Sequence, residues 1–299
     1  MPDTRTAPTA EEWIAHLRAL APADPHPLGS VGLIDAAARL RGRRAIVDGS
    51  SISLAHPVPA DFDDGRTRYA LRTAVRHEGP VTTFTDELQV GCHGIHHTHI
   101  DALCHVGVDG SFYGGVSQEL APQELSTELW GSEGIATRVV LLDLPGTLGV
   151  DWVDVDRPVT AADLDAALAL AGTTLEPGDG VILYMGRDRF EAAGGSYKTT
   201  AAARDGGRPG LGRDGADWLV AHRVSVLAWD FLDACNHDDP EYCIHLLIWA
   251  IGLALVDNCR LQEARDALAD RQVREGMLVV GPLRLEGSTG TLVNPLLLV

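Results

Sequence analysis

The sequence predicts an α/β protein with a mixed sheet and surrounding helices. Apolar segments typical of buried strands alternate with helical segments through the second half of the chain, as at residues 139–144, 160–170 and 178–186. With 299 residues, of which 45% are hydrophobic, the chain is long enough to bury a large core. These two observations favour a mixed α/β core, in one large domain or two fused domains.

The first part of the chain is predicted to be an arm followed by the start of a single domain. Residues 1–28 form the expected N-terminal arm, because a helix over 10–20 leads into a Pro-rich stretch that cannot continue it. Residues 29–299 form the expected catalytic domain. Its first elements are a helix over 33–40, strands over 50–58, 68–76 and 81–90, a polar loop over 61–66 and a turn over 77–80.

The second half supplies the alternating elements. Thr160 and Asp163 have the spacing of a capping box at the start of helix 160–170. Residues 187–217 are rich in glycine and arginine but lack phosphate-loop spacing, so we expect a long surface loop, either a lid or a disordered segment. The remaining elements are strands over 139–144, 178–186, 224–229 and 276–285, and helices over 218–221 and 261–268.

Charge and cysteine usage exclude several classes of partner. With 24 basic and 42 acidic residues the net charge is −18, which argues against nucleic acid and anionic membranes. The 5 cysteines show no Cys-x-x-Cys spacing, which is typical of a reducing compartment. The N-terminus lacks an apolar signal core, and no run of ~20 apolar residues could span a bilayer. We therefore expect a cytoplasmic protein that acts on a small molecule.

The segment from 92 to 115 carries the candidate chemistry. Five of the 12 histidines lie between His93 and His105, and Asp101 stands among them. Imidazole and carboxylate ligands together suit a divalent ion such as Zn, Mn or Fe. A solvated, His-rich strand end is the alternative, but it would not require Asp101 and His105 at these offsets.

The spacing can be tested against strand geometry. If residues 90–101 are extended, His93, His97, His99 and Asp101 point to one face and can converge on one ion. Asp101 can also cap a turn that brings His105 back over it as a general base.

These residues resemble a known family signature. Thr-His-Ile-Asp-Ala-Leu-Cys-His, residues 98–105, resembles the pattern His-x-Gly-Thr-His-x-Asp-x-Pro-x-His of the metal-dependent cyclase-like hydrolases, which include bacterial kynurenine formamidase and isatin hydrolase. The resemblance implies that His99 and Asp101 are metal ligands and that His105 is the acid/base. The family's first ligand aligns with Ile95, so another histidine must replace it. We favour His97, and the alternative is that a bulge near residue 94 brings in His93.

A second stretch is implied by the same resemblance. His245 and Asp257 match the interval of a His and an acidic residue that complete the family's metal site, although Asp257 replaces Glu. On one helix they would lie about 18 Å apart, so we expect a helix over 242–251 to end at Gly252 and a strand to return over 253–257. Tyr113, in an element resembling the family's aromatic-Asn-Gly, is expected to line the substrate pocket. His237 is expected to lie in a loop.

The resemblance also implies a function and an assembly. It implies a small barrel-like core, a Zn or Mn cofactor, and a homodimer or homotetramer. The expected activity is hydrolysis of an amide, lactam or related cyclic carbonyl compound by metal-activated water. One alternative is a polyketide-type cyclase or dehydratase with the same site, and another is a metal-free binding protein of this fold.

Overall fold

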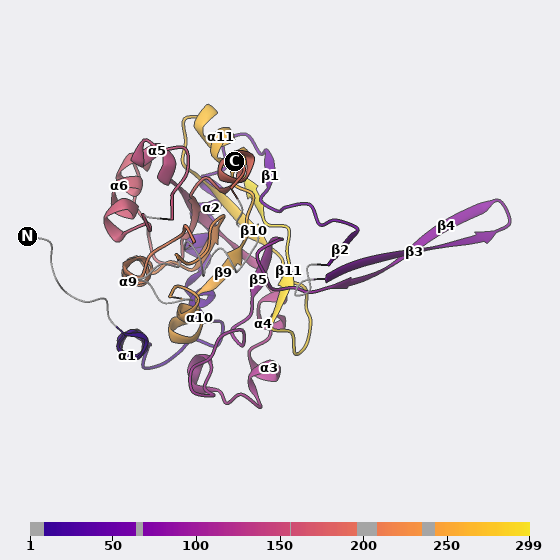
Figure 1. Cartoon of the computed structure of the whole chain (residues 1–299), viewed down its shortest axis with the longest axis horizontal. Coiled ribbons are helices and arrows are strands. Elements are labelled where there is room, and N and C mark those ends of the chain that lie inside the picture. Colours follow the sequence, from indigo (N-terminus) through magenta and orange to yellow (C-terminus); the bar gives the residue numbers. More distant parts are fainter. Residues whose placement is uncertain (1–8, 64–67, 156, 196–207, 235–242) are drawn as a thin grey trace, which may run out of the picture.

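The computed structural model describes residues 9–63, 68–155, 157–195, 208–234 and 243–299. Strands and helices alternate between residues 135 and 280, after five consecutive strands between residues 51 and 101 (Figure 1). The strands are β1 (Ser51–Ser53), β2 (Asp61–Asp63), β3 (Arg68–Glu78), β4 (Val81–Val90), β5 (His99–Asp101), β6 (Ile135–Asp143), β7 (Gly180–Tyr184), β8 (Val226–Trp229), β9 (Ala254–Asp257), β10 (Glu275–Val280), β11 (Gly290–Leu292) and β12 (Leu296–Leu298).

The helices follow most of the predicted positions. Thr160 forms the predicted capping box with Asp163 at the start of α6. The α-helices are α1 (Ala10–Leu20), α2 (Ala36–Arg44), α3 (Ala121–Glu124), α4 (Glu128–Gly131), α5 (Leu144–Leu148), α6 (Ala161–Ala171), α7 (Arg187–Ala192), α9 (Asp214–Ala221), α10 (Leu246–Ile251) and α11 (Gln262–Asp270), and the 3-10 helices are η1 (Gly29–Leu33) and η2 (Tyr113–Gly115).

Nine strands form one mixed sheet, which confirms the predicted fold class. Their order is β1-β12-β10-β6-β7-β8-β9-β5-β11, so the sheet is open at β1 and β11. The neighbours from β6 to β9 are parallel, and β5 and β10 pair antiparallel at either side of them. Side chains of the parallel strands are buried, which explains their continuous apolar sequences.

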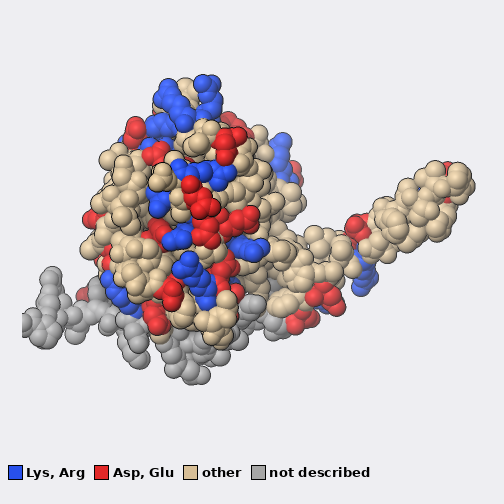
Figure 2. Space-filling view, turned by 90° about the horizontal axis from the view of Figure 1, so that it is seen from above, with Lys and Arg blue, Asp and Glu red and all other residues tan. Residues whose placement is uncertain are grey.

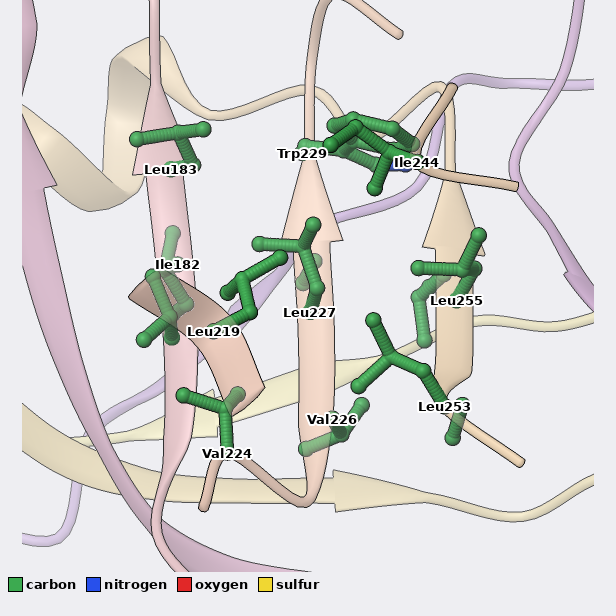
Figure 3. Packing of buried hydrophobic residues seen from close by; sticks show 14 of the residues in the cluster. Ile182, Leu183, Leu219, Val224, Val226, Leu227, Trp229, Ile244, Leu253 and Leu255 are labelled. Atoms are coloured by element: carbon green, nitrogen blue, oxygen red, sulfur yellow. The ribbon is translucent and has the colours of Figure 1, made fainter. Parts of the chain in front are cut away.

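The core lies against these parallel strands. Leu183 of β7 lies beside Trp229 of β8, Leu227 of β8 lies beside Leu255 of β9, and Leu219 of α9 packs against this layer (Figure 3). Each is at most 1% exposed. The core therefore fixes the carboxyl ends of neighbouring parallel strands, where α/β proteins commonly place their functional residues.

Two regions extend from this sheet. The strands β3 and β4 form a long hairpin that projects from the body, with β2 paired to its root (Figure 1). Helix α1 packs against α10 and buries Trp13 and Leu17. The division into an arm over 1–28 and a domain over 29–299 stays a prediction.

Several predicted boundaries were wrong. The strand expected over 50–58 ends at Ser53, and the one over 276–285 ends at Val280, shortly before Pro282, which has no N–H for the ladder. The stretch over 187–217 is not wholly a loop, because α7 occupies its start and α9 its end. His237, residues 64–66 and residues 196–207 of the predicted loops lie outside the described residues.

Within the described ranges, no helix has both the length and the apolar character needed to span a membrane.

Candidate metal centre

The centre forms where β5 meets the carboxyl end of β9. His99 lies directly opposite Asp257 in the antiparallel ladder between these strands. Asp101, two residues after His99, points to the same face of β5. All three side chains are at most 2% exposed. Strand pairing therefore brings residues separated by more than 150 positions into one buried site.

Two groups of candidate ligands share one carboxylate. Among the described residues, potential ligand atoms of His93, Asp101 and His105 lie within 4.8 Å of one another, and so do those of His99, Asp101 and Asp257. Asp101 belongs to both groups. Imidazole nitrogens and carboxylate oxygens are the donors that Zn and Mn accept.

Four imidazoles surround the Asp101 carboxylate. Its Oδ1 lies 2.9 Å from Nδ1 of His93 and 3.5 Å from Nε2 of His99. Its Oδ2 lies 3.6 Å from Nε2 of His105 and also 3.6 Å from Nε2 of His245. Burial opposes ionisation of Asp101, but the neighbouring imidazoles outweigh that effect and hold its pKa below the ordinary value.

One oxygen of this carboxylate lacks a hydrogen-bond partner. Oδ2 of Asp101 is buried and accepts no hydrogen bond from any described residue. A buried acceptor without a hydrogen bond costs ~1–3 kcal/mol, even with imidazoles 3.6 Å away. A cation beside Oδ2 would remove that cost.

His99 is oriented so that one nitrogen can bind a metal. Its Nδ1 lies 3.1 Å from the carbonyl oxygen of His97, which accepts a hydrogen bond from it. The proton is then on Nδ1, so the lone pair of Nε2 faces Asp101 and Asp257, at 3.5 and 3.9 Å. Metal-bound histidines are usually held in this way.

Comparison with known proteins places the chain in a family. The family model described as "Putative cyclase" matches residues 52–234. The chain belongs to this cyclase family. No match was found among curated proteins.

Solved structures share the fold of this cyclase-family chain. A structure described as a novel cyclase has a TM-score of 0.79 and 22% identity, over 92% of this chain and 94% of the other. Isatin hydrolase A from Labrenzia aggregata, bound to benzyl benzoate, has a TM-score of 0.59 and 18% identity, over 85% and 94%. Isatin hydrolase A from Ralstonia solanacearum has a TM-score of 0.55 and 17% identity, over 99% of both chains. At these identities the likeness shows the fold alone.

The structure brings His93 to the candidate metal centre. Residues 91–98 are not a strand, so the strand parity expected over 90–101 is wrong, and only His99 to Asp101 pair in the ladder. Gly94 has φ +127°, a conformation that L side chains rarely adopt, and it directs the chain past His93. Gly290 leaves room for the ring, because a Cβ there would lie 2.5 Å from Cε1 of His93.

His97 lies apart from both ligand groups. Its Nδ1 hydrogen-bonds to the hydroxyl of Tyr69, and its Nε2 lies 2.7 Å from the carbonyl oxygen of Cys92. Burial lowers its pKa to about 4. Both ring nitrogens fix the segment that leads from the hairpin to β5. Neither belongs to the two groups of candidate ligand atoms, whereas His93 does, so the geometry disfavours His97, our preferred replacement for the ligand at Ile95.

His105 returns to Asp101 through a turn, as expected, but not through a helix. Its backbone N–H donates to the carbonyl of Ala102 at 2.9 Å, which closes a β-turn. The His105 ring stacks on His93 at 4.1 Å between centroids. Burial lowers the pKa of its imidazole to about 4, although the Asp101 carboxylate opposes this shift.

His245 and Asp257 meet in the way that Gly252 predicts. Helix α10 ends at Gly252, whose φ of 68° reverses the chain into β9. Nε2 of His245 then lies 2.9 Å from Oδ2 of Asp257. The other oxygen of Asp257 accepts a hydrogen bond from Nε1 of Trp229 at 2.6 Å.

Asp233 is a site residue that our sequence analysis did not assign. Its carboxylate hydrogen-bonds to Nδ1 of His245 and accepts the backbone N–H groups of Ile244 and His245. Burial opposes protonation of His245, but Asp233 and Asp257 outweigh it and raise the pKa of the imidazole well above its ordinary value. The position of Asp233, just after the predicted strand 224–229, was the available signal.

Tyr113 is not brought to the ligand groups. It is 3% exposed, its hydroxyl donates to the carbonyl of His26 at 3.0 Å, and its ring lies beside Gly252, at the end of β9 remote from Asp257. Tyr113 therefore connects the N-terminal segment to the turn after α10, and its role in lining a substrate pocket stays a prediction.

Proposed function

We propose that this chain is a metal-dependent hydrolase of an amide, lactam or related cyclic carbonyl compound. The observation that carries the proposal is the buried carboxylate of Asp101, which lies among the imidazoles of His93, His99, His105 and His245 and whose Oδ2 accepts no hydrogen bond from the described residues. A buried carboxylate at the overlap of two ligand groups is what a divalent ion requires. The isatin hydrolases with this fold make a lactam a reasonable first substrate to test.

The residues fit Zn or Mn. His99, Asp101 and Asp257 would hold the ion from β5 and β9, and His93, rather than His97, supplies an imidazole from the segment before β5. The ion would supply Lewis-acid polarisation of a carbonyl group and of water. Trp229 holds the carboxylate of Asp257 and Asp233 holds the ring of His245, as the outer partners of metal ligands commonly do.

His105 is the proposed proton carrier. With a pKa lowered to about 4, its imidazole is neutral near pH 7 and can accept a proton at Nε2. The carboxylate of Asp101, 3.6 Å away, would stabilise the resulting imidazolium. His105 could then return the proton to the leaving group. Stacking on His93 keeps the ring in place during this exchange.

Ring closure or dehydration is the second candidate function. The description of the matching family as a cyclase favours it. The same imidazoles could remove and return protons without net addition of water. Mass spectrometry of the product distinguishes the reactions, because hydrolysis adds one water, cyclisation leaves the mass unchanged and dehydration removes one water.

The decisive experiment is metal analysis of protein purified without a His-tag and without added ions. We expect bound Zn or Mn in the native chain and its loss in Asp101→Asn, which keeps the shape but removes the charge. Asp143→Asn is the control, because Asp143 is also buried but lies outside both ligand groups; Asn can still cap α5, and only the ion pair with Arg265 is lost. A native chain that contains no divalent ion and gains none on incubation would contradict the proposal and favour a binding protein.

His105→Asn tests the proposed acid/base. We expect this variant to keep its metal and to hydrolyse isatin or another lactam ~10²–10⁴-fold more slowly. If the metal is lost as well, His105 is a ligand and another group moves the proton.

A further inference from the structure

The segment that carries His93 follows an irregular path into β5. Residues 91–98 belong to no strand, and Gly94 has φ +127°. The backbone N–H and C=O groups of such a segment have no ladder partners, so other groups must satisfy those that are buried. The position of His93 therefore depends on the groups that hold this segment.

Two side chains from other elements hold the carbonyl groups of the segment. Nη2 of Arg187 donates to the carbonyl oxygen of Ile95 at 2.7 Å. Nδ2 of Asn258 donates to the carbonyl oxygen of Gly94, also at 2.7 Å. These carbonyl groups belong to the two residues that directly follow His93 in the chain. Arg187 and Asn258 thus fix the backbone on the C-terminal side of His93.

Asn258 connects Arg187 to both ends of the segment. Its Oδ1 accepts a hydrogen bond from Nη1 of Arg187 at 2.7 Å, and its backbone carbonyl accepts one from the hydroxyl of Thr98, also at 2.7 Å. Arginine only donates and a carbonyl oxygen only accepts, so the side chain between them must do both, as an amide does. Asn258 also has φ +54°, a left-handed conformation that asparagine adopts more readily than most residues. Both requirements favour asparagine at this position.

Arg187 is itself fixed by the residue that follows β8. It begins α7, and the carboxylate of Asp230 accepts the backbone N–H groups of residues 185–187. Nη1 of Arg187 donates to the backbone carbonyl of Asp230 at 3.2 Å, and its Nε donates to Glu191 at 3.1 Å. The guanidinium group therefore connects the carboxyl ends of β7 and β8 to the segment before β5.

The burial of Arg187 also points to a role in positioning. On the face shown in Figure 2, basic and acidic side chains intermingle at the surface of the body. Arg187, by contrast, is 2% exposed, and Asn258 is 0% exposed. Burial of a charge is unfavourable unless the charge is paired and hydrogen-bonded, and a buried ion pair often adds little stability. The position that Arg187 imposes on its partners explains its burial better than stability does.

We propose that Arg187 and Asn258 form a clamp that positions His93 for the metal ion. Neither side chain would bind the ion, since arginine has no lone pair to offer and Oδ1 of Asn258 faces Arg187. Both act through the backbone of Gly94 and Ile95. The inference rests on the proposed function, because His93 is a ligand only if the centre binds a metal.

A double-substitution cycle with Asn258→Gly and His93→Ala tests the clamp. Glycine removes the side chain of Asn258 and suits the left-handed backbone. We expect Asn258→Gly to raise the dissociation constant for Zn ~10–100-fold, as loss of an outer partner of a ligand does. In the His93→Ala background the same change should alter the constant by no more than about 2-fold, because the residue through which the clamp acts is absent. Equal losses in both backgrounds, or no loss in either, would overturn the proposal.

Arg187→Lys provides a second variant, with Arg138→Lys as its matched control. Lysine keeps the charge but lacks the fixed fork of donors that reaches several acceptors at once. Arg138 is 8% exposed and also donates to a backbone carbonyl, that of Thr174, but it lies at the amino end of the parallel strands, opposite the candidate centre. We expect Arg187→Lys to weaken Zn binding about 10-fold or more and Arg138→Lys to leave it unchanged. Equal effects of the two variants would count against the clamp.

Hydrogen exchange of the metal-free chain separates this inference from the proposed function. The backbone N–H groups of residues 92–98 should exchange faster in Asn258→Gly than in the native chain, whereas those of α6 should not change. Unchanged exchange in residues 92–98 would overturn the clamp even if the native chain binds Zn. A native chain without metal affinity would refute the proposed function, while faster exchange in the variant would still support the clamp.

Discussion

Replacing Gly252 by alanine tests the turn that joins the two halves of the candidate metal centre. Gly252 has φ +68°, and a Cβ there would lie 2.5 Å from Cα of Gly29 and 2.9 Å from the ring of Tyr113. The left-handed conformation costs alanine ~1–2 kcal/mol. Separating two backbones that already touch adds ~1–3 kcal/mol, the usual cost of overpacking. We expect a total loss of ~2–5 kcal/mol in the free energy of unfolding.

Gly49→Ala is the matched control for this substitution. Gly49 has φ +80°, but a Cβ there would have no neighbouring atom within 4 Å. It should therefore show the conformational cost alone, ~1–2 kcal/mol. Urea denaturation measures both variants, and an unchanged m-value is required for the comparison.

The test compares Gly252→Ala with Gly49→Ala in both stability and metal affinity. Gly252→Ala should also weaken metal binding, because the turn sets the 2.9 Å approach of His245 to Asp257, whereas Gly49→Ala should not. Equal losses of stability in the two variants would show that the contact with Gly29 does not constrain the turn, and the reasoning would fail.

Four further substitutions separate the roles of residues in and around the centre. His93→Ala should weaken metal binding strongly. His97→Ala should leave metal affinity unchanged but lower the free energy of unfolding by ~1–3 kcal/mol, because the hydroxyl of Tyr69 loses its buried partner. Isothermal titration with Zn measures the first effect and urea denaturation the second, and the reverse pattern would restore His97 as the ligand. Asp233→Asn should lower metal affinity ~10–100-fold, the usual effect of an outer partner of a ligand, and an unchanged affinity would show that His245 needs no such support. Gly290→Ala should reproduce part of the His93→Ala defect, because the new Cβ would displace the ring; full metal affinity in this variant would show that His93 does not depend on that space.

Local sequence predicted much of the fold. The helix over 10–20, the capping box at Thr160 and the chain reversal at Gly252 each depend on a few neighbouring residues, and each was confirmed. Strand lengths were harder to predict from local sequence, because a strand ends where its hydrogen-bonded neighbouring strand ends. The partner of β1 is β12, which contributes three residues from the far end of the chain.

Only part of the candidate centre could be predicted, because it also depends on pairing between strands that lie far apart in the sequence. His99, Asp101, His105, His245 and Asp257 were recognised from their spacing and the family pattern, and the structure brings them together. The choice between His93 and His97 was made on the assumption of a long strand. The ladder that limits β5 to three residues is formed with β9 and β11, which local spacing before residue 101 does not specify.

The place of β5 in the sheet has a consequence for how the chain is made. β5 lies between β9 and β11, so both of its ladder partners leave the ribosome after it, separated from it by about 150 residues or more. The five histidines from His93 to His105 emerge much earlier, without Asp257 opposite them or the space at Gly290. If the centre binds a metal as proposed, the nascent chain offers imidazoles early, but the complete ligand set forms only after β9 and β11 have been synthesised.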